Sequence, residues 1–317
     1  MTGSGRLAGA AIGLFADRLL GEPPQLLHPV AAFGRAMTAL EHAVYADDRR
    51  VGVGYAALGV GAGALAGRVA GSTAVVVALS SSGRMLRQTA RTVGVALDRG
   101  DVEGARELLP ALVGRDPAAL DASGIAAATV ESVAENTVDA VVAPALFGAL
   151  LGASGAAAHR AVNTLDAMVG HPDDRYGRFG WAGARLDDLA AYVPARVTAL
   201  LVCAARPARA ANVVSAVRRD APGHPSPNAG VAEAAFAAAL GVELGGPTRY
   251  PTHLEERPRL GTGPRPAVAD IERAARLADR VEWLLIALLL VAARATRASR
   301  ITDPTAADAA PTSKGTS

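Results

Sequence analysis

The sequence has almost no lysine: of its 32 basic residues, only Lys314 is a lysine. A Walker A phosphate-binding loop requires a lysine, and a pyridoxal enzyme requires one for its Schiff base. Adenylate-forming ligases commonly use one as well. Because Lys314 lies in a C-terminal stretch of small polar residues that we expect to be disordered, mechanisms that depend on lysine are disfavoured.

Cysteine and paired histidines are also scarce. Cys203 is the one cysteine, so the chain contains neither an internal disulfide nor a cysteine metal cluster. The 6 histidines include no HxxxH or HxH pair. A zinc site is therefore disfavoured, since such sites draw on closely spaced cysteine and histidine ligands.

Apolar residues, by contrast, are abundant and unevenly distributed. Hydrophobic residues make up 50% of the chain, and the mean hydropathy of +0.23 is high for a soluble domain of this length. They gather in Val51–Ser80, Val138–Ala158, Leu189–Ala205 and Val281–Ala293. We predict an all-α, polytopic integral membrane protein with several transmembrane or re-entrant helices and polar functional loops. It would form one domain over residues 1–300, followed by a disordered tail over 301–317.

Glycines in the first apolar stretch indicate close helix packing. Gly59, Gly63 and Gly67 recur at four-residue spacing, which lets two helices approach closely in a membrane. Gly61, Gly63 and Ala66 imitate part of a dinucleotide-binding fingerprint. The acidic residue expected about 20 residues later is missing, so the packing interpretation is preferred.

An acidic helix leads into the second apolar stretch, in the sequence TVESVAENTVDAVVAPALFG. Glu131, Glu135 and Asp139 follow one another at four-residue spacing, and on a helix they share one face with a drift of about 40° per step. No lysine or arginine stands between Glu131 and His159 to neutralise them locally. Ionisable residues at membrane depth are costly, and they usually mark a functional site.

Two further acidic groups lie nearby in the sequence: Asp166 with Asn163, and Asp187 with Asp188. Spaced carboxylates with an amide neighbour suit Mg²⁺, which leaves positions for water and phosphate oxygens. The alternative is that the acids pair with arginines in structural networks. The arginines available for such pairing are Arg160, Arg175, Arg178, Arg185 and Arg196.

Two histidines precede prolines, His28 in LLHPV and His224 in GHPSPNAG. Proline holds the residue before it in an extended or turn conformation, so each loop can present an imidazole rigidly. A capping or packing role is the simpler interpretation of a lone histidine.

Taken together and in order, several motifs resemble the CobD/CbiB family of adenosylcobinamide-phosphate synthases. They are HPV with Gly34, ESVAENTVDAVVAP, AVNTLDAMVGH, GWAGARLDDL with PAR, and HPSPNAGVAEAAFAAALGVELGG followed by RPRLG. The resemblance extends from about Asp17 to Leu290. The sequence departs from the family pattern at Glu22, Pro117, Ala140 and Ala232, but none of these departures removes a charged group.

The resemblance implies a multi-pass protein of the bacterial cytoplasmic membrane. Members of the family join adenosylcobyric acid to (R)-1-amino-2-propanol or its O-2-phosphate through an amide bond, with ATP as co-substrate and Mg²⁺. The expected partners are the corrinoid, the aminopropanol and the lipid bilayer, with no nucleic acid. A homo-oligomer or a complex with other enzymes of cobalamin synthesis is left open.

The amide bond requires an activated carboxylate, and the γ-phosphoryl group of ATP would activate it. Glu131, Glu135 and Asp139 are expected to hold Mg²⁺ and, with His224, to form the catalytic group. The expected substrate- and phosphate-binding residues are Arg115, Asn136, Asn163, Asp166, Arg185, Asp188, Arg196, Ser226 and Asn228.

Two other classes of protein remain as alternatives. A Mg-dependent membrane prenyl- or phosphotransferase would also use acidic helices. A non-enzymatic scaffold or transporter would explain the apolar segments but not the loops rich in Asn, Asp and His.

Overall fold

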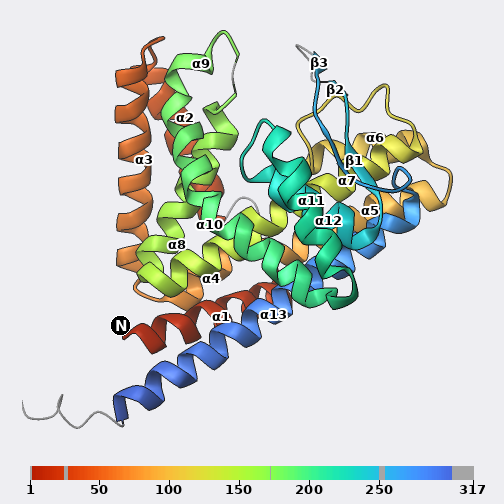
Figure 1. Cartoon of the computed structure of the whole chain (residues 1–317). Coiled ribbons are helices and arrows are strands. Elements are labelled where there is room, and N and C mark those ends of the chain that lie inside the picture. The colour runs from red at the N-terminus through yellow and green to blue at the C-terminus, as the bar shows by residue number, and fades with distance from the viewer. Residues whose placement is uncertain (1, 25–27, 172, 250–253, 302–317) are drawn as a thin grey trace, which may run out of the picture.

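The computed structural model describes residues 2–24, 28–171, 173–249 and 254–301 (Figure 1). Apart from its first residue, the tail predicted over 301–317 lies outside the described residues. The chain is mainly helical, which confirms the predicted fold class. Within the described residues, four short strands are the exception, and they pair as two antiparallel ladders, β1 with β4 and β2 with β3.

The α-helices are α1 (Gly3–Leu20), α2 (Pro29–Val44), α3 (Arg49–Ala70), α4 (Thr73–Ser80), α5 (Gly83–Asp98), α6 (Val102–Leu108), α7 (Ala122–Thr137), α8 (Ala143–Val169), α9 (Tyr176–Phe179), α10 (Trp181–Ala205), α11 (Ala210–Asp220), α12 (Ala229–Leu240) and α13 (Val268–Ile301). A π-helical turn, η2 (Val138–Val142), joins α7 to α8. The 3₁₀ turns are η1 (Leu109–Ala111), η3 (Pro207–Arg209) and η4 (Ala221–Gly223), and the strands are β1 (Glu243–Gly245), β2 (Thr248–Arg249), β3 (Leu254–Glu255) and β4 (Arg259–Gly261).

In the described part of the chain, three helical segments are long and apolar enough to cross a membrane. They are α3, the continuous segment Ala122–Val169 made of α7, η2 and α8, and α10. Their outer faces carry exposed apolar side chains such as Leu65, Leu189 and Leu200, which suits contact with lipid. The fourth predicted apolar stretch, Val281–Ala293, lies in α13, which is not among the three.

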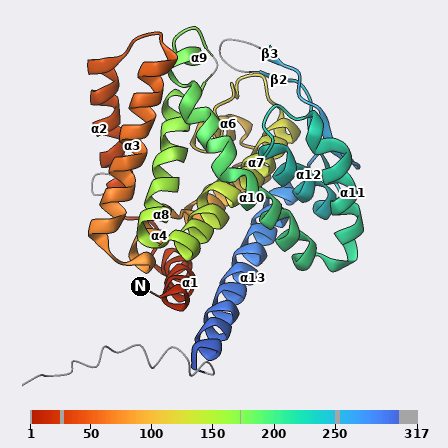
Figure 2. The same ribbon diagram turned by 60° about the vertical axis from the view of Figure 1, so that its left-hand side comes forward.

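The helices surround the segment formed by α7, η2 and α8 (Figures 1 and 2). The second half of α8 packs against α3, and α10 packs against both α8 and α12. At one end of the molecule α1 and α13 lie side by side, and α13 continues along α5 and α7. Residues from α7, α8, α10 and α12 are thereby brought together.

The predicted glycine packing is confirmed at the contact between α3 and α8. A Cβ atom added to Gly63 would lie 2.7 Å from the Cβ of Ala161, and one added to Gly67 would lie 2.4 Å from the carbonyl oxygen of Ala153. At Gly59 it would lie 2.8 Å from Leu165 Cδ1. These distances leave no room for a side chain, so the glycines set how closely the two helices approach.

A proline leaves one carbonyl of the π-helical turn without its usual donor. In an α-helix the carbonyl of Ala140 would accept a hydrogen bond from residue 144, but Pro144 has no N–H to donate. The backbone N–H of Ser82 donates to this carbonyl instead, at 3.0 Å. The loop between α4 and α5 thus satisfies the carbonyl that Pro144 leaves free, and the turn that contains Asp139 stays helical.

α8 bends at Gly152, whose φ of 76° and ψ of -159° are not helical. A residue with a Cβ would be strained at this positive φ. Beyond the bend, a small apolar cluster packs α8 against α2, α3 and α9 through Met37, Tyr55, Leu165, Val169 and Phe179. The bend therefore sets the direction of the half of α8 that carries Arg160, Asn163 and Asp166.

We predict that Gly67→Ala destabilises the protein by roughly 1–3 kcal/mol, because the new methyl group overlaps the α8 backbone. Gly61→Ala is the matched control in the same helix, since nothing lies within 4 Å of the added atom. Because alanine has a higher helix propensity than glycine, Gly61→Ala should leave stability unchanged or raise it by up to about 1 kcal/mol. Thermal unfolding of the detergent-solubilised variants measures both effects, and equal stability of the two would contradict the packing argument.

Candidate active site

A polar cavity of about 150 Å³ lies among the end of α7, η2, α8, α10 and the start of α12. Four carboxylate residues from four elements line it: Glu135 of α7, Asp139 of η2, Asp166 of α8 and Asp187 of α10. Ser226 and Asn228, from the loop before α12, complete the polar part of the lining. The fold therefore brings Glu135, Asp139, Asp166, Ser226 and Asn228, all predicted site residues, to one place.

The carboxylates are close enough to repel one another. Asp139 interacts electrostatically with Asp187, Glu135 and Asp166, while Arg160 is the cation that acts on it. Gathering like charges in a partly buried cavity is unfavourable unless protons or cations balance them. Their arrangement thus favours binding of a cationic group.

The cavity suits a hard divalent cation that keeps part of its water shell. Among the described residues, no three His, Cys, Asp or Glu side chains converge closely enough to hold an ion by themselves. Mg²⁺ does not require such a cage, because one or two carboxylates commonly hold it while water and substrate phosphate oxygens fill the remaining positions. The carboxylates around the cavity fit this mode of binding.

The loop GHPSPNAG forms the N-terminal side of α12. Ser226 Oγ accepts hydrogen bonds from the backbone N–H groups of Asn228 and Ala229, at 3.3 and 3.2 Å. The Asn228 side chain donates to the carbonyl of Asp188 at 2.7 Å and accepts from Arg196 at 2.8 Å. Arg196 also lies over the Tyr192 ring, 3.5 Å from its centroid. Arg196 therefore positions Asn228 at the cavity.

Glu131, the first member of the predicted acidic ladder, does not line the cavity. It is buried and forms an ion pair with Arg115, and its Oε1 accepts from the backbone N–H of Gly245 in β1 at 2.8 Å. Both oxygens are thus engaged by the protein. The countercharge missing from the neighbouring sequence comes from Arg115, 16 residues earlier in the chain.

Behind Glu135 lies a buried group that the sequence analysis did not identify. Glu233, in α12, is fully buried, and its Oε1 lies 3.4 Å from His224 Nε2 and 4.0 Å from an Arg257 nitrogen. Burial and the nearby carboxylates of Glu135 and Glu131 raise the pKa of Glu233 well above its ordinary value. Burial and then Arg257 lower the pKa of His224. The predicted base His224 therefore contacts Glu233 and does not line the cavity.

The other predicted residues are placed in different ways. Asn136 turns back along α7 and donates to Ser132. Asn163 donates to Asp187, an acid of the cavity, at 3.5 Å. Arg185 is exposed and is not part of the cavity lining, while Asp188 contributes its backbone carbonyl to Asn228.

One signal could have identified Glu233 from the sequence. It is a single acid within the apolar stretch AGVAEAAFAAAL, and no lysine or arginine follows it until Arg249. The same reasoning that selected Glu135 and Asp139 applies to it, because an isolated acid in an apolar helix requires a partner.

Fold and cavity together define a class of protein: a helical membrane protein whose apolar helices enclose a polar cavity lined by carboxylates. The family model described as CobD/Cbib protein matches residues 10–278. The chain belongs to this family.

Curated relatives resemble the chain over most of its length. It is 48% identical over 301 residues to the cobalamin biosynthesis protein CobD of Mycobacterium tuberculosis (strain H37Rv), covering 90% of this chain and 96% of the relative. The protein of the same name from Chromobacterium violaceum is 44% identical, with coverage of 89% and 95%. That of Geobacter metallireducens is 42% identical, with coverage of 92% and 97%. No solved structure matches the chain.

We predict that Arg115→Gln destabilises the protein by about 3–5 kcal/mol, because the buried carboxylate of Glu131 would lose its countercharge. The double variant Arg115→Gln with Glu131→Gln should be less destabilised than the sum of the single variants, because no uncompensated charge remains. Unfolding in denaturant measures the difference. If Arg115→Gln kept full stability but weakened ATP binding, Arg115 would instead be the phosphate ligand expected from the sequence.

We predict that Glu233→Gln makes the stability of the protein less dependent on pH. The folded state raises the pKa of Glu233 above its unfolded value of 4.5. This difference stabilises the folded wild type at a pH below the unfolded pKa, and the contribution is lost as the pH rises towards the folded pKa. The neutral amide removes this loss. Melting temperatures between pH 5 and pH 8 should fall less in the variant, and parallel curves would show that Glu233 ionises freely in the folded protein.

Proposed function

We propose that the protein joins the free carboxylate of adenosylcobyric acid to the amine of (R)-1-amino-2-propanol or its O-2-phosphate, producing adenosylcobinamide or its phosphate. Membership of the CobD/CbiB family and the names of the curated relatives support a role in cobalamin synthesis. The observation that carries the proposal is the cavity lined by Glu135, Asp139, Asp166 and Asp187. Such a cavity attracts an ammonium group and a divalent cation.

The chemistry proceeds in two balanced steps. A carboxylate oxygen of the corrinoid attacks the γ-phosphorus of ATP, which produces an acyl phosphate and releases ADP. The free amine then attacks the acyl carbon, and the C–O bond to phosphate breaks as the C–N bond forms. The attacking nitrogen loses one of its two protons as the amide forms, and inorganic phosphate leaves.

The cavity supports the second step through its charge. Its carboxylates favour the ammonium form of the aminopropanol and so concentrate this substrate beside them. Glu135 lines the cavity and interacts with the buried Glu233, and we propose that it accepts a proton from the ammonium. This step releases the free amine that the reaction requires.

Asp139 and Asp187, with Asp166 beside them, are the residues that would hold Mg²⁺. Bound there, the ion would balance charge on the ATP phosphates. Glu131 is left out of this set because Arg115 and the backbone of Gly245 occupy its oxygens. Arg196 acts indirectly, since it holds Asn228 at the cavity.

We propose that the protein is embedded in the bacterial cytoplasmic membrane through α3, the Ala122–Val169 segment and α10. ATP and the corrinoid precursor are cytoplasmic, so the cavity has to be reached from that side. The apolar helices of the protein would then contact the lipid bilayer directly. A homo-oligomer, or a complex with other enzymes of the pathway, would form in that membrane.

Complementation tests the proposed reaction. A cobalamin auxotroph that lacks this step should grow on cobinamide with an empty vector, and on either cobyric acid or cobinamide when it carries this gene. Failure of the gene to restore growth on cobyric acid, in cells that produce the protein, would refute the function. Turnover of an isoprenoid diphosphate by the purified protein would favour the prenyltransferase alternative.

We predict that Asp139→Asn and Asp187→Asn each lower the rate of amide formation at least about a hundredfold, because the isosteric amide keeps the shape of the cavity but removes a charge that its chemistry needs. Glu107→Gln is the matched control, since Glu107 is an exposed acid in α6. Rates are measured with purified protein over a range of Mg²⁺ concentrations. Near-normal rates in both aspartate variants at limiting Mg²⁺ would contradict the assignment.

A further inference from the structure

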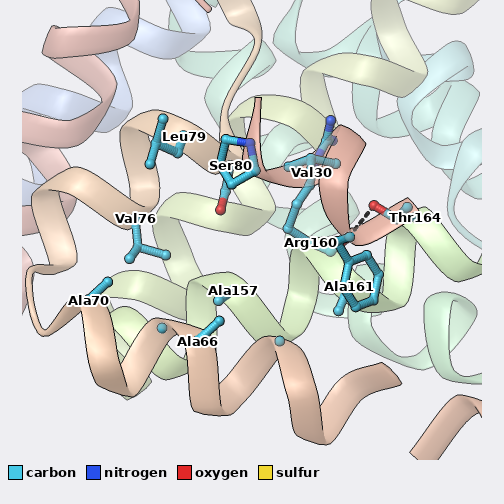
Figure 3. A pocket seen from close by; sticks show the side chains of 14 residues that line it. Val30, Ala66, Ala70, Val76, Leu79, Ser80, Ala157, Arg160, Ala161 and Thr164 are labelled. Atoms are coloured by element: carbon cyan, nitrogen blue, oxygen red, sulfur yellow. Dashed lines mark hydrogen bonds between the residues drawn. The ribbon is translucent and has the colours of Figure 1, made fainter. Parts of the chain in front are cut away.

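A second pocket, of about 650 Å³, opens beside α8 and the start of α2. Glu22, His28 and Arg160 are its charged or titratable residues, and Val30, Gly34 and Met85 are among its other neighbours. It adjoins a smaller, mostly apolar pocket of about 160 Å³ between α3, α4 and α8, which shares Val30, Arg160 and Thr164 with it. Figure 3 shows this smaller pocket, in which Ser80, Arg160 and Thr164 are the labelled polar side chains among apolar ones.

Arg160 has few partners for so large a donor group. The hydrogen bond that its guanidinium makes among the described residues runs from Nη1 to Asn163 Oδ1, at 3.3 Å. Its Nε is buried without a partner. A guanidinium group has five N–H donors, and leaving them unpaired in an apolar setting is costly. Arg160 is therefore poised to bind a planar anion.

Arg160 is also linked to the carboxylate-lined cavity. Asn163 accepts from Arg160 and donates to Asp187, so a chain of two hydrogen bonds connects the second pocket to the cavity. Arg160 interacts electrostatically with Asp139 and with Glu22, although it forms an ion pair with neither in the described residues. An anion bound at Arg160 would therefore lie close to groups held by the cavity acids.

We propose that Arg160 binds the reacting carboxylate of the acid substrate at the junction of the two pockets. This inference rests on the proposed function and adds a subsite to it. Arginine matches a carboxylate with two parallel hydrogen bonds, and its charge gives specificity for the ionised acid. The amine would occupy the acidic cavity, so the two reactants would be drawn to opposite charges on either side of Asn163.

The size of the second pocket favours the corrinoid acid over a small phosphate as the ligand of Arg160. Its volume, with the apolar pocket beside it, suits part of a bulky molecule with apolar edges. The cavity of about 150 Å³ suits the small aminopropanol. The competing structural role is that Arg160 only balances the charges of Asp139 and Glu22.

Binding measured without ATP or Mg²⁺ separates these roles. Equilibrium dialysis, followed by the visible absorption of the corrinoid, compares adenosylcobyric acid with an analogue whose free carboxylate is a primary amide. In Arg160→Gln the affinity for the acid should fall about ten- to a hundredfold, while that for the amide analogue stays within about twofold. Arg160→Lys should fall in between, because an ammonium lacks the paired donors. Arg35→Gln, at an exposed arginine of α2, is the control and should match the wild type.

Unchanged binding of the amide analogue also shows that the variant is folded. If Arg160→Gln kept the wild-type preference for the acid, the inference would be wrong while the proposed function stood. Loss of both corrinoids would assign Arg160 to the shape of the pocket and overturn the inference. Weaker binding of ATP or aminopropanol phosphate, with the acid preference intact, would identify a phosphate site instead. A wild type that binds neither corrinoid would refute the inference and the proposed function together.

Discussion

The cost of burying charge among apolar helices is the constraint on which this structure depends. Several buried charges are balanced by residues far away in the chain: Glu282 of α13 pairs with Arg18 of α1 and Arg87 of α5. Glu41 of α2 accepts from both Arg175 and Tyr176. A buried pair contributes little net stability, but a buried charge without a partner is strongly destabilising, so these pairs fix which helices can lie together. They act as constraints on arrangement more than as sources of stability.

Against this background, the carboxylate-lined cavity and Arg160 are exceptions. Asp139, Asp166 and Asp187 face one another across a small space, and Arg160 is largely buried with one hydrogen bond from its guanidinium among the described residues. Unbalanced groups of opposite sign in neighbouring pockets are what binding two oppositely charged reactants requires. Leaving these groups unbalanced lowers the stability of the free protein. A ligand of opposite charge would raise that stability again when it binds.

Backbone features position these groups as much as side-chain contacts do. Pro144 removes a donor, Ser82 supplies one, and the π-helical turn between α7 and α8 places Asp139 at the cavity. π-Helical turns within longer helices frequently occur at functional sites. The bend at Gly152 and the close contact of Gly63 and Gly67 with α8 then set where Arg160 and Asp166 lie. Residues without functional groups thus determine the geometry of the candidate site.

The sequence by itself determined the class of fold, the family, the glycine contact and most acids of the cavity. These follow from local signals: apolar length, four-residue spacing, and ordered motifs that do not depend on distant residues. Only the tertiary structure decided which acids act together. Glu131 is paired with Arg115 and with the backbone of β1. Asp187 of α10 lines the cavity instead, and Glu233 lies behind Glu135. Helical periodicity specifies the face on which a side chain lies, but the partner of that side chain depends on how distant segments pack, and for a buried charge the partner decides its role.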